Sequence, residues 1–156
     1  MITVIKNYDI QDITDNVKRL LEVASHAPEV RRLAIQITSD REDKITAIYD
    51  WVKQHVQYVP DPTSIELFVS PVRIVKDYYE CKTIGEDCDG HAILVTALCR
   101  SIGINSNVVL IDSLGNGLDH AFSEVWSEKL NCWINVDTTS EYPIGWIYKY
   151  SQRIVV

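Results

Sequence analysis

The sequence predicts an α+β fold in a single domain. Apolar residues recur at helical spacing through the first half of the chain, whereas apolar and polar residues alternate through much of the second half. At 156 residues, one domain can bury a substantial hydrophobic core. No internal repeat, linker or low-complexity tract divides the chain, so we expect helices and strands to share one core.

Three helices are expected before residue 60. The first covers residues 9–24, and the second begins at Pro28, whose missing N–H is harmless in a first turn. The third follows a capping box formed by Ser39 and Glu42 and ends before Pro60. Residues 60–87 are expected to be irregular, apart from a short segment at 72–75 that could be helix or strand.

A strongly amphipathic helix is expected to begin at Cys88 and to end at Gly103, because glycine is common just after a helix. The remainder of the chain alternates as strands do. The expected strands are 107–112, 120–127, 132–137 and 147–155.

The connection between the second and third of these strands fixes their expected register. Residues 128–131 form a tight turn with an even number of residues, which pairs Trp126 with Trp133. His120 is then a diagonal neighbour of Asp137 on the same face of the sheet.

Cys88, His120 and Asp137 therefore have the residue types and order of a nucleophile, a base and an orienting acid. A thiol at a helix N-terminus lies near unpaired N–H groups and a partial positive charge, which favour the thiolate. Each residue also has a plainer interpretation, because a single cysteine in a first turn is often just a small buried residue. The combination of all three favours the catalytic interpretation.

The other cysteines do not indicate a metal site or disulfides. Cys81, Cys88, Cys99 and Cys132 contain no C-x-x-C pair, and Cys88 with His91 lacks a second ligand pair for zinc. We expect reduced thiols, with Cys99 and Cys132 serving as small buried residues.

The net charge of −7 argues against a nucleic-acid surface, since phosphate binding needs clustered lysine and arginine. No apolar run is long enough to span a membrane, and the N-terminus lacks the basic and then apolar pattern of a signal peptide. We expect a soluble protein, either cytoplasmic or part of a larger assembly.

Three motifs together resemble those of the transglutaminase-like superfamily. They are Cys88 at a helix start followed by the turn at 101–104, His120-Ala121 on a strand, and Asp137 followed by two threonines. The resemblance covers roughly residues 40–140, with 1–38 as a helical N-terminal extension and 141–156 as a C-terminal strand. It implies a papain-like core in which the nucleophile helix packs on an antiparallel sheet.

The resemblance implies a cysteine-dependent hydrolase of peptide, isopeptide or amide bonds that works through a thioester on Cys88. The alternatives are acyl transfer to amines, as in transglutaminases, and a non-catalytic binding or assembly domain. Protein or peptide substrates are expected in either enzymatic case. The oxyanion would be bound by the Cys88 N–H and by Tyr58 or Trp51, and His91 would line the cleft.

Asp87 and Asp89 flank the nucleophile, which is a departure from the simplest form of the motif. Bacterial transglutaminase-like cysteine proteases can have acidic residues there and bind calcium, so the resemblance allows a calcium site near Asp87 and Asp89. The interpretation we prefer requires no cofactor and makes Asp87 the N-cap of the helix. Two such carboxylates would raise the pKa of the Cys88 thiol and oppose the effect of the helix.

Overall fold

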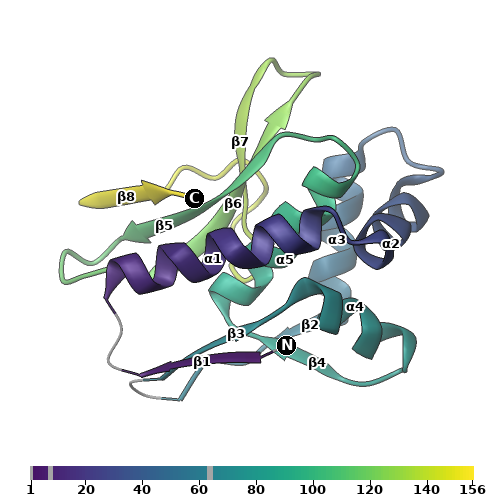
Figure 1. Cartoon of the computed structure of the whole chain (residues 1–156). Coiled ribbons are helices and arrows are strands. Elements are labelled where there is room, and N and C mark those ends of the chain that lie inside the picture. The colour runs from purple at the N-terminus through teal and green to yellow at the C-terminus, as the bar shows by residue number, and fades with distance from the viewer. Residues whose placement is uncertain (1, 7–8, 63–64) are drawn as a thin grey trace.

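The helix that begins at Cys88, α5 (Cys88–Ser101), lies at the centre of the protein (Figure 1). The computed structural model describes residues 2–6, 9–62 and 65–156. On one side α5 contacts strands β5 and β6, and on the other side it contacts four helices. These helices are α1 (Ile10–Ser25), α2 (Pro28–Thr38), α3 (Lys44–His55) and α4 (Pro71–Tyr79).

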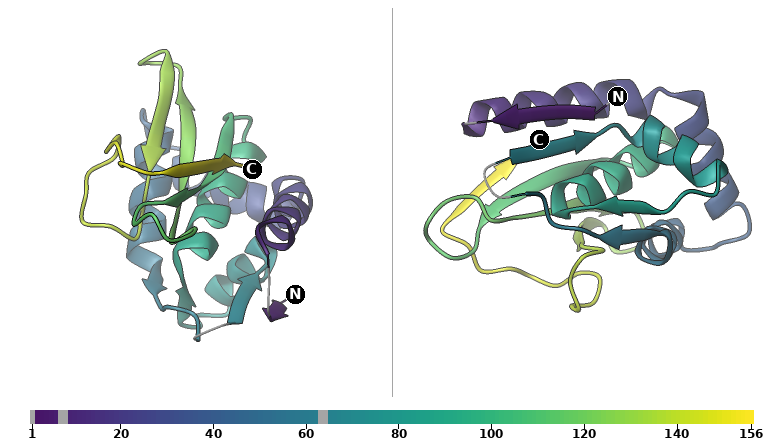
Figure 2. Two further views of the ribbon diagram at one scale, coloured as in Figure 1. Left: turned by 90° about the vertical axis from the view of Figure 1, so that its left-hand side faces the viewer. Right: turned by 90° about the horizontal axis from the view of Figure 1, so that it is seen from below.

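The largest sheet is antiparallel and has four strands in the order β7-β6-β5-β8, and Figure 2 shows β8 beside β5 at its edge. Its strands are β5 (Ser106–Asp112), β6 (His120–Ser127), β7 (Cys132–Val136) and β8 (Gln152–Val155). Two smaller sheets lie near the N-terminal end of α5. They pair β1 (Ile2–Lys6) with β3 (Ile65–Val69), and β2 (Val56–Tyr58) with β4 (Ile84–Glu86).

The predicted mixture of helices with an antiparallel sheet is thus confirmed, but α5 is not amphipathic in its surroundings. All its residues from Asp89 to Cys99 are buried, because the sheet covers one side and α1, α2 and α3 cover the other. A helix enclosed in this way needs small or apolar residues all round. The first residue, Cys88, is one of the few half-buried positions, so the helix presents its N-terminal end to the surface.

The predicted capping box at Ser39 and Glu42 is wrong. Ser39 has helical backbone angles (φ −58°, ψ −38°) and closes α2 instead. The N-cap of α3 is Asp43, whose carboxylate accepts hydrogen bonds from the N–H and the hydroxyl of Thr46 at 3.1 and 2.8 Å. Aspartate serves this position as well as serine does, so the sequence contained two competing signals.

Residues 60–87 are more regular than the sequence predicts. They contain β3, the helix α4 and β4. Pro71 occupies the first turn of α4, and this resolves the ambiguous segment at 72–75 as helix. Strand β3 pairs with β1 from the N-terminal end of the chain, a partner that local sequence does not reveal.

The register predicted for β6 and β7 is confirmed. Trp126 lies opposite Trp133, and their rings meet edge to face with centroids 5.7 Å apart. Pairing runs only from Ser123 to Ser127, so the start of β6 extends beyond the end of β7. Cys132 is exposed rather than buried because it stands at the outer end of this hairpin. The last strand is shorter than predicted and begins at Gln152.

Within the described residues, no helix combines the length and the apolar character needed to cross a bilayer.

Candidate active site

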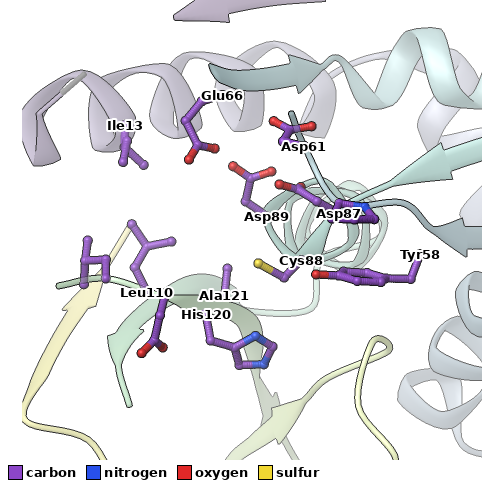
Figure 3. A pocket seen from close by; sticks show the side chains of 13 residues that line it. Ile13, Tyr58, Asp61, Glu66, Asp87, Cys88, Asp89, Leu110, His120 and Ala121 are labelled. Carbon is purple, nitrogen blue, oxygen red and sulfur yellow. The ribbon is translucent and has the colours of Figure 1, made fainter. Parts of the chain in front are cut away.

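Cys88 lies in the first turn of α5, with Asp87 as the N-cap residue. The Asp87 carboxylate accepts the Gly90 N–H at 3.1 Å, which satisfies one of the free donors of the helix. The Cys88 sulfur lies against the start of β6, where the backbone N–H of Ala121 donates a hydrogen bond to it. The thiol is half-buried and opens into a pocket (Figure 3).

Tyr58 reaches the same pocket because β2 and β4 pair in parallel. The register places Tyr58 opposite Glu86, two residues before Cys88, and the Val59 N–H donates to the Glu86 carbonyl at 2.9 Å. In Figure 3 the Tyr58 hydroxyl points toward Cys88. Burial, followed by the nearby Cys88, raises the pKa of Tyr58, so its hydroxyl keeps its proton at neutral pH.

His120 opens β6 on the same pocket and is held by Asp137. Its Nε2 lies 2.7 Å from Asp137 Oδ2. This contact does not use the other ring nitrogen, Nδ1. The second carboxylate oxygen of Asp137 accepts the N–H and the hydroxyl of Thr139, each at 2.8 Å.

Tyr148 also contacts this pair, and no sequence motif singled it out. Its hydroxyl donates to Asp137 Oδ2, the same oxygen that His120 contacts. Its ring stacks on Phe122 with centroids 5.0 Å apart and lies 5.4 Å from the His120 ring. We predicted a strand at 147–155, but Tyr148 lies in the irregular segment before β8. Only the folded chain brings it to Asp137.

These contacts keep Asp137 ionised. Burial by itself would raise the pKa of Asp137, but the hydrogen bonds from His120 and Tyr148 outweigh it and hold the pKa well below its ordinary value. An anionic Asp137 orients the imidazole and stabilises its protonated form.

Trp51 and His91, two residues considered for the cleft, do not line the pocket. Trp51 stacks on His55 with ring centroids 4.6 Å apart and meets the Tyr78 ring of α4 edge to face at 4.9 Å. His91 is only 2% exposed, and its Nδ1 lies 2.8 Å from the Thr138 hydroxyl. Burial lowers the pKa of His91, so the ring is neutral and links α5 to the end of β7.

The pocket beside the thiol has a volume of about 220 Å³ and is strongly acidic. Asp61, Glu66 and Asp87 each place a carboxylate oxygen within 4.8 Å of the others, close enough to hold a cation. An all-oxygen set of this kind suits Ca²⁺. The calcium site considered near Asp87 and Asp89 stays a prediction, and the fold adds Asp61 and Glu66 to its possible ligands.

The acidic surroundings also act on Cys88. Burial, then Asp87 and Asp89, raise the pKa of the Cys88 thiol, and the hydrogen bond from Ala121 only partly opposes them. The ease of ionisation expected from the helix N-terminus is therefore outweighed. In the free protein the sulfur carries its proton at neutral pH.

Comparisons with known proteins show the family and the fold. The sequence model of the transglutaminase-like superfamily matches residues 31–138. A candidate cysteine protease from Cytophaga hutchinsonii has a similar structure, with a TM-score of 0.56, 19% identity, and coverage of 99% of this chain and 62% of that one. A candidate protease from Parabacteroides distasonis has a TM-score of 0.59, 12% identity, and coverage of 81% and 26%. At these identities the likeness concerns the fold, and the chain spans less than two thirds of either protein. No curated protein shows significant sequence similarity to the chain.

Proposed function

This chain belongs to the transglutaminase-like superfamily, and we propose that it is a cysteine-dependent hydrolase of peptide, isopeptide or amide bonds. The observation that carries the proposal is the contact between His120 and the ionised Asp137, on a pocket that also contains the Cys88 sulfur. The three residues come from α5, β6 and the end of β7.

The reaction begins with a proton transfer. His120 Nδ1 takes the Cys88 proton as the sulfur attacks the substrate carbonyl, because the thiol is protonated in the resting protein. The imidazolium, stabilised by Asp137, then gives this proton to the departing amine. A thioester remains on Cys88, and His120 draws a proton from water as the water attacks it. The carboxylic acid product leaves, and the thiol is restored.

Two donors support oxyanion binding in this proposal. The backbone N–H of Cys88 lies at the start of α5, and the Tyr58 hydroxyl points to the sulfur from β2 (Figure 3). Because the Tyr58 pKa is raised, this hydroxyl remains a donor throughout the neutral range. Both groups belong to rigid elements and need little reorganisation when charge develops.

Alkylation of the Cys88 thiol tests the proposal. Cys81 and Cys132 are also exposed, so the parent protein is a Cys81→Ser/Cys132→Ser variant in which Cys88 is the accessible thiol. We expect His120→Ala to slow alkylation by iodoacetamide at pH 7 by about 10²-fold or more. His26→Ala, which changes an exposed histidine at the end of α1, is the matched control. Equal alkylation rates in His120→Ala and the parent would contradict the proposal.

The fate of the thioester separates the proposal from its alternatives. Peptide or ammonia release without amine incorporation supports hydrolysis, whereas incorporation of a labelled primary amine supports acyl transfer. An alkylation rate that is independent of His120, with the ordinary thiol pKa of about 8.5, supports a non-catalytic domain.

A further inference from the structure

The pocket beside Cys88 has a one-sided charge. Its lining residues include acidic side chains from four parts of the chain but no lysine or arginine. The acidic ones are Asp61, Glu66, Asp87, Asp89 and Asp119. Clusters of this kind are common on protein surfaces, so the charge by itself does not establish a binding site.

Asp89 supplies the second observation. Its side chain is 6% exposed, and the Oδ1 atom is fully buried with no hydrogen-bond partner among the described residues. The side chain shares a hydrogen bond with Asp87, and Figure 3 shows the carboxylate directed toward Asp61 and Glu66. A buried carboxylate oxygen without a donor is costly, and a cation that enters the pocket would satisfy it.

The pocket has a further wall that a metal ion would not use. Ile13, Leu110 and Leu118 line it, and Figure 3 shows Ile13 and Leu110 away from the tyrosine side of the pocket. An apolar wall that leads to a group of carboxylates matches a side chain with a methylene stem and a charged end.

We propose that this pocket binds the ammonium or guanidinium group of a lysine or arginine side chain next to the bond that Cys88 attacks, so that the substrates are basic peptides. This inference rests on the proposed thiol chemistry and names the substrate class of the same site. Asp61, Asp87 and Asp89 surround the cationic group, and the stem lies along the apolar wall. The Cys88 sulfur lines the same pocket, so the side chain belongs to a residue adjoining the scissile bond.

Two thiol reagents of similar length test this inference without a known substrate. Aminoethyl methanethiosulfonate carries a cation and propyl methanethiosulfonate does not. Each forms a mixed disulfide with the Cys88 thiolate and releases methanesulfinate. Because both reagents consume the same thiolate, the ratio of their rates cancels any change in the Cys88 pKa. The measurement uses the Cys81→Ser/Cys132→Ser protein.

We expect the ratio to favour the cationic reagent in the parent and to fall about tenfold in Asp89→Asn. Asp61→Asn is a second variant with the same expectation, and its amide oxygen can still accept the Leu67 N–H as the carboxylate does. Glu128→Gln removes the same charge from the exposed turn between β6 and β7 and should leave the ratio unchanged. Equal ratios in the parent, Asp89→Asn and Asp61→Asn would overturn the inference.

A titration with calcium tests whether the pocket binds a metal ion instead of a cationic side chain. Calorimetric titration with CaCl₂ should show only weak binding, and millimolar Ca²⁺ should leave most of the cationic preference intact. Tight Ca²⁺ binding that disappears in Asp61→Asn and abolishes the preference would overturn the inference in favour of a metal site. The rate ratio is also measured in His120→Ala. A preserved ratio there supports the pocket even if the catalytic proposal fails.

Discussion

Asp137 and Asp89 both lie near the Cys88 thiol and are almost equally buried, but their pKa values are shifted in opposite directions. Asp137 is 7% exposed and Asp89 is 6% exposed. Asp137 accepts hydrogen bonds from His120, Tyr148 and Thr139, and its pKa is held far below the ordinary value. Asp89 faces other carboxylates, and burial followed by Asp87 raises its pKa well above the ordinary value.

The difference shows that burial does not decide what a carboxylate can do. On the Asp137 side, His120, Tyr148 and Thr139 donate to the carboxylate, so it needs no group from outside the protein. On the Asp89 side, no described residue donates to Oδ1, so this oxygen is satisfied by a proton or by a cation from outside. In the proposals above, the first side serves proton transfer and the second serves recognition of a cationic side chain.

The most severe test of the Asp137 side is Asp137→Asn. The amide has no charge to stabilise protonated His120, and its single oxygen cannot accept both from His120 and Tyr148 on one side and from Thr139 on the other. We expect turnover, or the rate of Cys88 alkylation at pH 7, to fall by about 10²–10⁴-fold. The chain should also lose stability at neutral pH, because a carboxylate with a lowered pKa stabilises the fold above its unfolded pKa. Alkylation kinetics and urea denaturation measure the two effects, and an active, fully stable variant would remove the contrast.

The stability of a Glu86 variant tests the acidic region around Asp89. Burial, then Asp87 and Asp61, raise the pKa of Glu86 to about 8. As the pH rises from about 4.3 toward 8, the unfolded chain releases a proton that the folded chain keeps, so the free energy of unfolding falls. Glu86→Gln removes this loss and should raise the free energy of unfolding at pH 7 by about 1–3 kcal/mol, with little change near pH 4.

Urea denaturation of the Glu86→Gln variant at several pH values makes this measurement. Glu128→Gln, at an exposed position, should show no pH-dependent gain. A loss of stability at neutral pH in Glu86→Gln would mean that the carboxylate has a stabilising partner. The surroundings of Glu86 would then resemble those of Asp137, and the contrast would fail.

The smallest expected effect is that of Tyr148→Phe, which sharpens the description of the Asp137 side. The variant keeps the ring that packs on Phe122 and His120 but removes the hydroxyl that donates to Asp137. We expect kcat to fall about tenfold with KM unchanged, as for one hydrogen bond to a charged group. Tyr150→Phe is the control, because Tyr150 is an exposed ring in the same segment of the chain. Equal losses in the two variants would show that Tyr148 contributes packing alone.

The sequence predicted the parts of the site that depend on local pattern. The start of α5 at Cys88 follows from its N-cap, and the meeting of His120 with Asp137 follows from the even turn that also pairs Trp126 with Trp133. These arguments use neighbours in sequence or the period of a strand, and both are visible without a structure.

What the sequence did not predict depends on segments that are distant along the chain. Tyr148 reaches Asp137 from an irregular segment that has no periodicity to interpret. Asp61 and Glu66 lie just before and within β3, and they reach the pocket because β3 pairs with β1 near the N-terminus. The sequence predicted that Asp87 and Asp89 would oppose the ionisation of Cys88. Only the burial of the thiol in the fold shows that their effect outweighs that of the helix N-terminus.

The early end of β7 limits how this fold can be remodelled. Its pairing stops at Ser123, and beyond that point the Ala121 N–H turns to the Cys88 sulfur instead of to a neighbouring strand. Lengthening β7 by a residue pair would offer the Ala121 N–H a backbone carbonyl and would build new chain over the Cys88 sulfur. The short length of β7 therefore keeps the sulfur at the start of α5 uncovered, and loop grafts in this fold must preserve it.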